Sequence, residues 1–177
     1  MARVFISFVH EDEKVAESVQ RYITEQLKLT GDVFLSSDQW QVFAGEVWLD
    51  RIKGELTEAE VVILMLSKRS VDRPWVNFEA GAAWLRDKPI VPVCYGNMTK
   101  GSLPKPYSGI QALDLPSEKY YMVCSVAHHL GIMAPPPEGL KAVADLISNE
   151  PESVHAKIGR FLNLNIRDAI ASFKDVD

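Results

Sequence analysis

Glu79 differs from the other acidic residues of this chain in its surroundings. It lies in a stretch otherwise free of charge and follows Trp75 by four residues, about one helical turn. Trp75, Phe78, Ala82 and Leu85 form an apolar stripe at helical spacing, and Glu79 borders it. A carboxylate beside two aromatic rings is partly desolvated, a setting in which acidic groups often do chemistry. The alternative is an ordinary surface glutamate that favours a helix N-terminus.

A second set of candidates comes from segments at and after the predicted strands. Their hydroxyl, carboxylate, imidazole and aromatic groups suit hydrogen bonding to a small ligand and stacking against it. These candidates are Phe8, His10, Ser36, Asp38, Trp40, Trp48 and Ser67. The alternatives are a core aromatic for Phe8 and Trp75, a solvated turn for residues 36–40, and a turn cap for Ser67.

The elements that must position these residues follow from the spacing of apolar side chains. Five short apolar runs predict strands, and the third is apolar at every position, as in a strand covered on both faces. Amphipathic segments between the runs predict helices. The predicted strands are Val4–Phe8, Val33–Leu35, Val61–Leu66, Ile90–Cys94 and Ile110–Leu113, and the predicted helices cover about 13–29, 46–56, 74–86 and 118–130.

This alternation predicts an α/β fold, a flavodoxin-like doubly wound sheet of five parallel strands in the order 2-1-3-4-5. In such sheets ligands bind beyond the carboxyl ends of the strands, where the strand order reverses. That rule selects the loop after the first strand (8–12) and the loop and helix after the third (67–79). The loop after the second strand, 36–45, would overhang the same crevice.

The bulk composition limits the classes of partner. The chain has 177 residues, of which 47% are hydrophobic and 24% charged, and this predicts one main globular domain. A formal net charge of −5 argues against nucleic acid and anionic membranes as partners. The start of the chain lacks a signal-peptide pattern and the longest apolar run has six residues, so a cytoplasmic location is predicted.

Two further predictions concern metals and the C-terminal part. Cys94 and Cys124 lie apart in apolar stretches, and the adjacent His128 and His129 cannot share a helix face, so no metal site is predicted. A proline-rich segment then separates residues 1–133, the main domain, from 134–177, which we expect to form a docked helical extension.

Three motifs, in order and at suitable spacing, carry a resemblance to a known family. Val4-Phe5-Ile6-Ser7-Phe8 with His10-Glu11-Asp12 resembles the first signature of TIR domains. Ala44-Gly45-Glu46-Val47-Trp48 resembles the end of their loop after the second strand. The segment from Ser70 through Trp75 to Glu79 resembles the Ser…Trp-x-x-x-Glu motif of the largely bacterial, NAD-cleaving branch. The likeness covers about residues 3 to 131.

The resemblance implies a function and a set of roles. Glu79 would be the catalytic residue of an NAD+ glycohydrolase or cyclase that yields nicotinamide and ADP-ribose or a cyclic isomer. NAD+ would be the substrate, no cofactor or metal would be needed, and Trp75 and the second set of candidates would contact the substrate. Activity would depend on self-association through TIR–TIR contacts, in bacterial anti-phage signalling or an abortive response, with another defence-system protein as a further partner.

Three other functions fit parts of the pattern. A non-catalytic TIR interaction module would signal by assembly alone, and the Trp-x-x-x-Glu setting of Glu79 speaks against it. A phosphorelay receiver would need an Asp at the end of the third strand and a Lys at the end of the fifth, where Leu66-Ser67 and Leu113-Asp114 stand. A flavodoxin would need a phosphate loop rich in Ser, Thr and Gly after the first strand.

Overall fold

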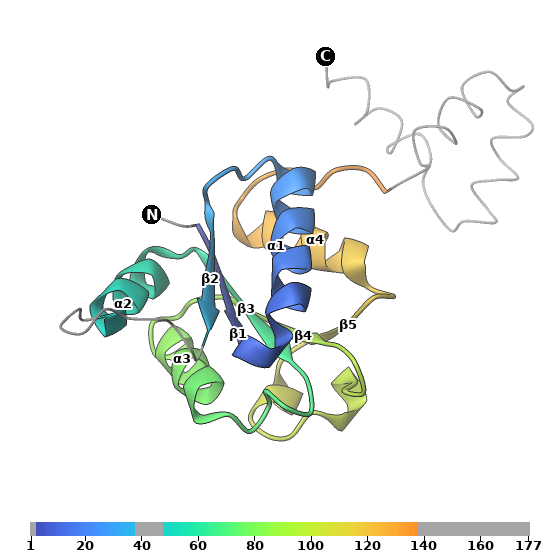
Figure 1. Cartoon of the computed structure of the whole chain (residues 1–177). Coiled ribbons are helices and arrows are strands. Elements are labelled where there is room, and N and C mark those ends of the chain that lie inside the picture. Colours follow the sequence, from blue (N-terminus) through green and yellow to red (C-terminus); the bar gives the residue numbers. More distant parts are fainter. Residues whose placement is uncertain (1–2, 38–47, 138–177) are drawn as a thin grey trace, which may run out of the picture. The chain divides into compact units, whose positions relative to one another are not determined.

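A five-stranded parallel sheet forms the centre of the fold (Figure 1). The computed structural model describes residues 3–37 and 48–137. The strands are β1 (Val4–Phe8), β2 (Val33–Ser37), β3 (Val61–Leu66), β4 (Ile90–Cys94) and β5 (Leu113–Asp114). Their spatial order is β2-β1-β3-β4-β5, and every pairing is parallel. The predicted fold class and strand order are therefore confirmed.

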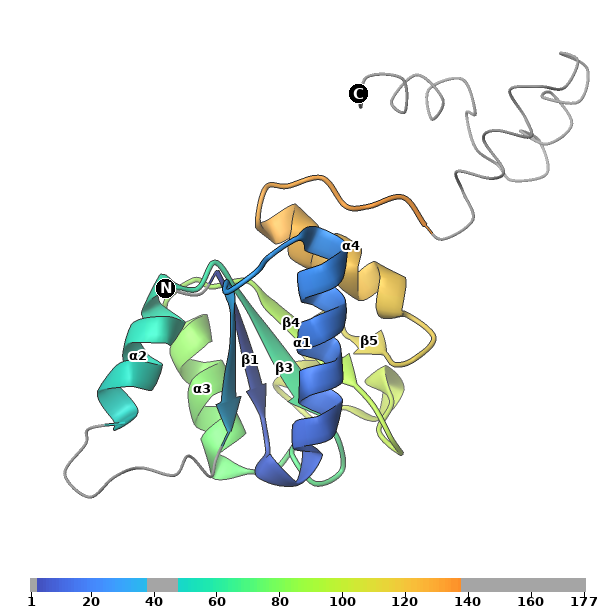
Figure 2. The same cartoon turned by 45° about the horizontal axis from the view of Figure 1, so that its top comes forward.

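Helices cover both faces of this sheet (Figures 1 and 2). α1 (Glu13–Leu27) and α4 (Lys119–His129) lie on one face, and α2 (Trp48–Glu58) and α3 (Pro74–Trp84) lie on the other. The buried apolar side chains accordingly form two clusters, one under each pair of helices. Because side chains alternate along a strand, β1, β2, β3 and β4 each contribute to both clusters.

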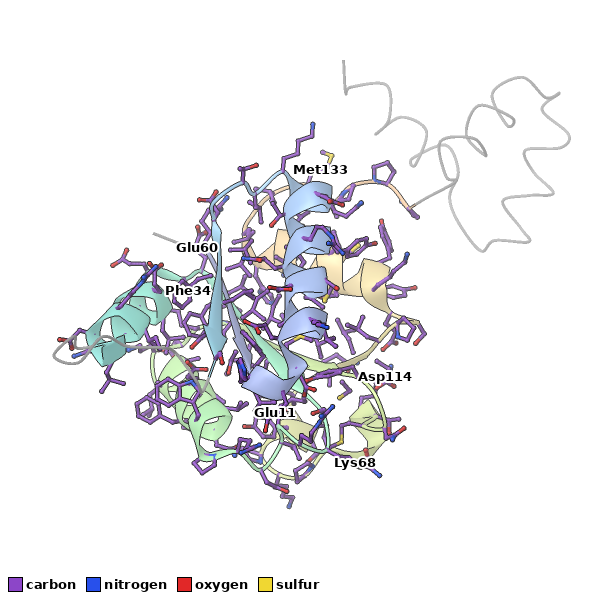
Figure 3. The ribbon with its side chains drawn as sticks, in the orientation of Figure 1. Glu11, Phe34, Glu60, Lys68, Asp114 and Met133 are labelled. Atoms are coloured by element: carbon purple, nitrogen blue, oxygen red, sulfur yellow. The ribbon has the colours of Figure 1, made fainter. Side chains whose placement is uncertain are left out.

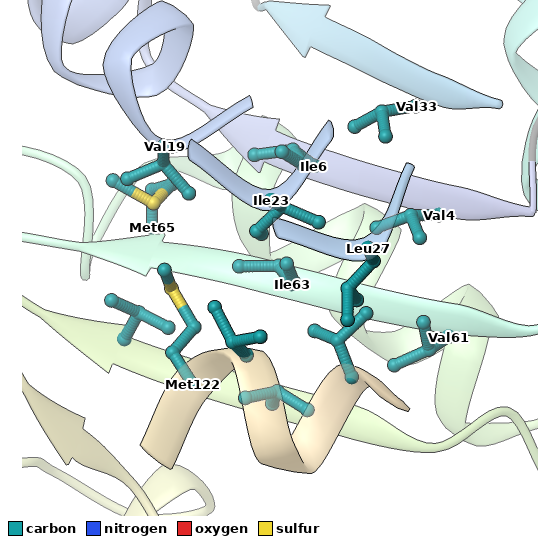
Figure 4. Close-up of a cluster of buried hydrophobic side chains, with 14 of the residues drawn as sticks. Val4, Ile6, Val19, Ile23, Leu27, Val33, Val61, Ile63, Met65 and Met122 are labelled. Atoms are coloured by element: carbon teal, nitrogen blue, oxygen red, sulfur yellow. The ribbon is translucent and has the colours of Figure 1, made fainter. Parts of the chain in front are cut away.

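The core under α1 and α4 explains the first predicted helix (Figure 4). Val19, Ile23 and Leu27 of α1 pack over β1 and β3 and meet Met122 of α4. Val15 of the same helix is 38% exposed, whereas its neighbour Ala16 is buried. The helix ends because Lys28 adopts the left-handed conformation (φ 54°) and its N–H bonds back to the carbonyl of Thr24.

The apolar stripe predicted for α3 is wrong at two of its four positions, although Trp75 and Ala82 do pack against the core. Val76, Ala80 and Ala83 face the sheet together with Glu79, whereas Phe78 and Leu85 are 56% and 77% exposed. This helix is apolar around nearly its whole circumference, so hydrophobic spacing does not select a face. Small side chains allow the closest approach to the sheet, and they decide which face is buried. Glu79 thus lies on the buried face rather than at its border.

The ends of two strands also differ from the prediction. β5 was expected at residues 110–113, but only Leu113 and Asp114 pair with β4. The chain before them forms a 3-10 turn at Tyr107–Gly109, which keeps this edge strand short. β2 extends two residues further than predicted, through Ser36 and Ser37, because both pair with β1.

The remaining predictions concern the links. The segment between β4 and β5 is irregular, as expected, with 3-10 turns at Lys100–Ser102 and Tyr107–Gly109. The helical extension predicted for 134–177 falls almost entirely outside the described residues. No helix among the described residues is long and apolar enough to cross a membrane.

A pair of substitutions tests the orientation of α3. Ala83→Leu should lower the free energy of unfolding by about 1–3 kcal/mol, because added methylenes have no room against the sheet. Leu85→Ala should change it by no more than about 0.5 kcal/mol, because Leu85 is exposed. Chemical denaturation of both variants measures the difference. If Leu85→Ala lowered the free energy of unfolding more than Ala83→Leu did, Leu85 would face the core as the sequence predicted.

Candidate functional site

Glu79 is a fully buried acid on the sheet-facing side of α3. Its exposed fraction is 0%, and the hydroxyl of Ser36 at the end of β2 donates to its Oε1 at 2.5 Å. Removing a carboxylate from water costs several kcal/mol, so buried carboxylates in proteins are normally paired or hydrogen-bonded. Two residues that the sequence analysis selected independently are therefore in direct contact.

The register of β1 and β2 explains how Ser36 reaches Glu79. Ser36 lies two positions after Phe34 and so shares its face of the sheet, the face covered by α2 and α3. Ser7 of β1 pairs with Ser36 and points to the same side. Within the described part of the chain, the buried Ser7 hydroxyl makes no hydrogen bond. Two hydroxyl groups from neighbouring strands thus lie under the helix that carries the acid.

Polar contacts fix the start of α3. Pro74 occupies the first turn, and Arg73 before it is extended, as the residue before a proline prefers. Arg73 forms an ion pair with Glu11 in the 3-10 turn η1 (His10–Asp12). Asn77 donates to the carbonyl of Arg73 at 2.9 Å and accepts from the hydroxyl of Tyr107 at 2.5 Å. The turn of helix before Glu79 is therefore held by the loops after β1 and β4.

Trp75 lies one helical turn before Glu79 and is half-buried. Its ring stacks on that of Phe78, with centroids 5.6 Å apart and planes inclined by 29°. The pair forms an aromatic surface at the N-terminal end of α3. An aromatic surface beside a carboxylate suits a ligand that has a flat ring and a developing positive charge.

Three other predicted site residues do not join Glu79. Phe8 is 2% exposed and packs in the cluster under α1 and α4, on the other face of the sheet. His10 is exposed, with Nδ1 3.9 Å from Glu13 Oε2. Ser67 is buried and donates to Asp12 Oδ2 at 3.0 Å. Phe8 and Ser67 therefore occupy structural positions rather than positions beside Glu79.

The remaining predicted site residues cannot be placed. Asp38 and Trp40 lie outside the described residues. Trp48 begins α2, but its side chain is not described. Their roles as substrate contacts stay predictions.

Sequence reasoning missed a second polar group, centred on Asp12. This carboxylate is 4% exposed and accepts hydrogen bonds from Ser67 and, at 2.6 Å, from the hydroxyl of Tyr95. Arg69 Nη2 lies 3.0 Å from Asp12 Oδ1. Burial, and then the bond to Asp12, raise the pKa of Tyr95, so the phenol stays a donor. The group ties together the segments that follow β1, β3 and β4.

A signal for this group was present in the sequence. Tyr95 and Ser67 each follow directly after a strand, and Asp12 belongs to the loop after β1. The rule that carboxyl ends of parallel strands share one edge places all three together. The rule does not show that they bond to one another. Among the described residues, no group of three or more His, Cys, Asp and Glu side chains is placed to hold a metal ion.

A sequence model of the TIR domain matches residues 4–122, which include every described strand and the first turn of α4. The chain belongs to the TIR-domain family. Glu79 and Ser36 lie inside the matched region, and residues 138–177 lie beyond it. A comparison with curated protein sequences gives no significant match.

Two solved structures share the fold of this TIR domain, both of a metazoan TIR-STING receptor from C. gigas. The first has 19% sequence identity and a TM-score of 0.53, and the match covers 72% of this chain and 40% of that one. The second, a complex with 2',3'-cGAMP, has 17% identity and a TM-score of 0.54, with 93% and 53% covered. The chain thus spans about half or less of the length of these proteins.

Removing the Tyr95 hydroxyl tests the Asp12 group. Tyr95→Phe should lower the free energy of unfolding by about 1–3 kcal/mol, because it takes a donor from a buried carboxylate. Tyr121→Phe is the matched control: Tyr121 is 62% exposed, and the change should stay within about 0.5 kcal/mol. Urea denaturation at neutral pH measures both. Equal effects of the two substitutions would contradict the arrangement.

The stability difference between the wild type and Tyr95→Phe should depend on pH. Because the pKa of Tyr95 is raised in the folded state, its contribution to stability is complete below the ordinary value of 10.0 and is lost as the pH rises beyond it. The difference in stability between wild type and Tyr95→Phe should therefore shrink above pH 10. A difference that grows there would show that the folded state favours the phenolate.

Proposed function

We propose that this TIR domain cleaves NAD+ between nicotinamide and ribose, with Glu79 as the catalytic residue. The observation that carries the proposal is the buried Glu79 carboxylate, which accepts a hydrogen bond from Ser36 and follows the half-buried Trp75 by one helical turn. Membership of the TIR family, which includes NAD-cleaving enzymes, supports it. We further propose a role in an immune signalling or abortive response.

The chemistry requires little beyond one carboxylate. The bond between ribose C1′ and the pyridinium nitrogen breaks, and its electron pair stays on nitrogen, so nicotinamide leaves neutral and needs no acid. Positive charge develops on the ribose as an oxocarbenium ion, and a nearby carboxylate stabilises this charge. Water then adds to C1′ and releases a proton, which gives ADP-ribose. Attack by a group of the substrate itself would give a cyclic product instead.

Ser36 and Trp75 would assist in different ways. The Ser36 hydroxyl donates to Oε1 and so fixes the carboxylate in one orientation. In the proposed complex the carboxylate would accept hydrogen bonds from the ribose hydroxyl groups. Trp75, stacked on Phe78, would support a flat ring of the substrate.

Catalysis requires that a substrate reach the Glu79 carboxylate. Glu79 is fully covered in the structure, so its cover must open before a substrate reaches the carboxylate. TIR enzymes as a family complete their sites through assembly, with the loop after the second strand of one copy contributing to a neighbour. In this chain that loop follows Ser37 and lies outside the described residues.

A non-catalytic interaction module is the second candidate. Phe78 and Trp84 on α3 and Leu85 directly after it are between 56% and 77% exposed, and large exposed apolar side chains close together favour a contact with another protein. Such a contact serves an adaptor and a self-assembling enzyme equally well. Cleavage of NAD+ by the purified chain therefore separates the two functions.

Glu79→Gln should reduce NAD+ cleavage by about 10²-fold or more, because the substitution keeps the volume and removes the charge that faces the oxocarbenium ion. Glu58→Gln is the matched control, since Glu58 is exposed at the end of α2 and should leave the rate unchanged. Nicotinamide release is measured by chromatography, and circular dichroism establishes folding. A folded Glu79→Gln protein with wild-type turnover would remove Glu79 from catalysis.

Specific activity should rise steeply with protein concentration, because assembly is proposed to complete the site. The measurement is turnover per chain over a hundredfold range of concentration, with oligomeric state followed by light scattering. Trp84→Ala should weaken the rise without unfolding the domain, because Trp84 is 69% exposed. Constant turnover from a protein that remains monomeric would contradict activation by self-association.

A further inference from the structure

A separate cleft lies at the carboxyl ends of β3, β4 and β5. Its volume is about 780 Å³, within the range of small-molecule sites. The segments after the three strands form one side, through Lys68 and Arg69, Gly96 and Asn97, and Leu115 and Pro116. Lys68 lies at the edge of the sheet where the strands end, as does Glu11 (Figure 3).

Helices α1 and α4 form the other side of the cleft, so the cleft and Glu79 lie on opposite faces of the sheet. Val19 and Tyr22 of α1 and Met122 of α4 line the cleft, and they belong to the cluster under these two helices. Glu79 lies on the opposite face of the sheet, under α3. A ligand in this cleft would therefore occupy a site of its own.

The charged residues that line the cleft favour an anion. Lys68, Arg69 and Lys119 bring three positive charges, and Asp12 is the one carboxylate among the described residues that line it. Asp12 is already bound by Arg69, Tyr95 and Ser67. The two lysines thus remain as a positive rim on a chain whose net charge is −5.

The walls between these charges favour a flat apolar group. Tyr22 is half-buried, and its ring already attracts a cation, with Lys119 Nζ 5.5 Å from the ring centroid. Val15, Val19, Leu115, Pro116 and Met122 supply the apolar surface. A ring that stacks on Tyr22 would place an attached anion near Lys119.

We propose that this cleft is a second binding site, for an anionic ligand of nucleotide size: an aromatic base against Tyr22 and phosphate groups between Lys68 and Lys119. The inference does not depend on the activity proposed for Glu79. It rests on the volume of the cleft, its positive rim and its aromatic wall, all of which lie on the α1 and α4 side of the sheet.

Isothermal titration calorimetry with ADP as the probe tests the proposal. ADP should bind saturably with a Kd below about 1 mM. Adenosine, which lacks the charge, and pyrophosphate, which lacks the ring, should each bind at least about tenfold more weakly. No saturable ADP binding, or pyrophosphate binding as tight as ADP binding, would overturn the proposed site.

Two double variants with equal change in charge locate the binding. Lys68→Ala with Lys119→Ala should weaken ADP binding about tenfold. Lys14→Ala with Lys53→Ala is the control, because both lysines are exposed and neither lines the cleft. If both double variants weakened ADP binding equally, net charge alone would explain the effect, and the proposed site would be wrong.

Two single variants separate this site from the catalytic one. Tyr22→Leu keeps an apolar side chain but removes the ring, so it should weaken binding of ADP and leave that of pyrophosphate unchanged. Glu79→Gln should bind ADP as the wild type does, whether or not it cleaves NAD+. Loss of ADP binding in Glu79→Gln would place the ligand under α3 and overturn the cleft.

Discussion

β3 is buried along its whole length, and the positions of the other elements follow from that constraint. All six of its side chains, Val61 to Leu66, are 0% exposed. A strand without a polar face needs helices on both sides, and parallel strands need crossover connections that supply them. Neighbouring crossovers then bring the loops after β1 and β3 to one edge of the sheet. The Glu79–Ser36 pair and the Asp12 group both lie toward that edge.

The strands could be predicted from sequence because runs of apolar residues between turn residues define them. The prediction for α3 was wrong because helical spacing selects a face only when the other face is polar. In α3 the choice was made by volume, since Ala80 and Ala83 pack against the sheet where Trp84 and Leu85 cannot. The small side chains that pack against the sheet also bring Glu79 to the buried face. The spacing of apolar residues alone does not predict this.

The candidate site, like the fold, could be predicted from the sequence only in part. Glu79 was found because a charge stands alone among apolar residues, and Ser36 because it follows a strand. Their contact depends on the register of β2 against β1, which sequence spacing does not give. The Asp12 group was missed because its members are far apart in the chain, with Asp12 and Tyr95 separated by 83 positions. Only the common edge of the sheet brings them together.

The short turn η1 limits how this protein can vary in length. Glu11 and Asp12 are consecutive, yet Glu11 pairs with Arg73 at the start of α3 and Asp12 pairs with Arg69 beside the cleft. A 3-10 helix turns by about 120° per residue, so one inserted or deleted residue rotates the following side chain by a third of a turn. Such a change would withdraw a buried carboxylate from its partners. Insertions in this loop are therefore expected to be selected against, although most surface loops tolerate them.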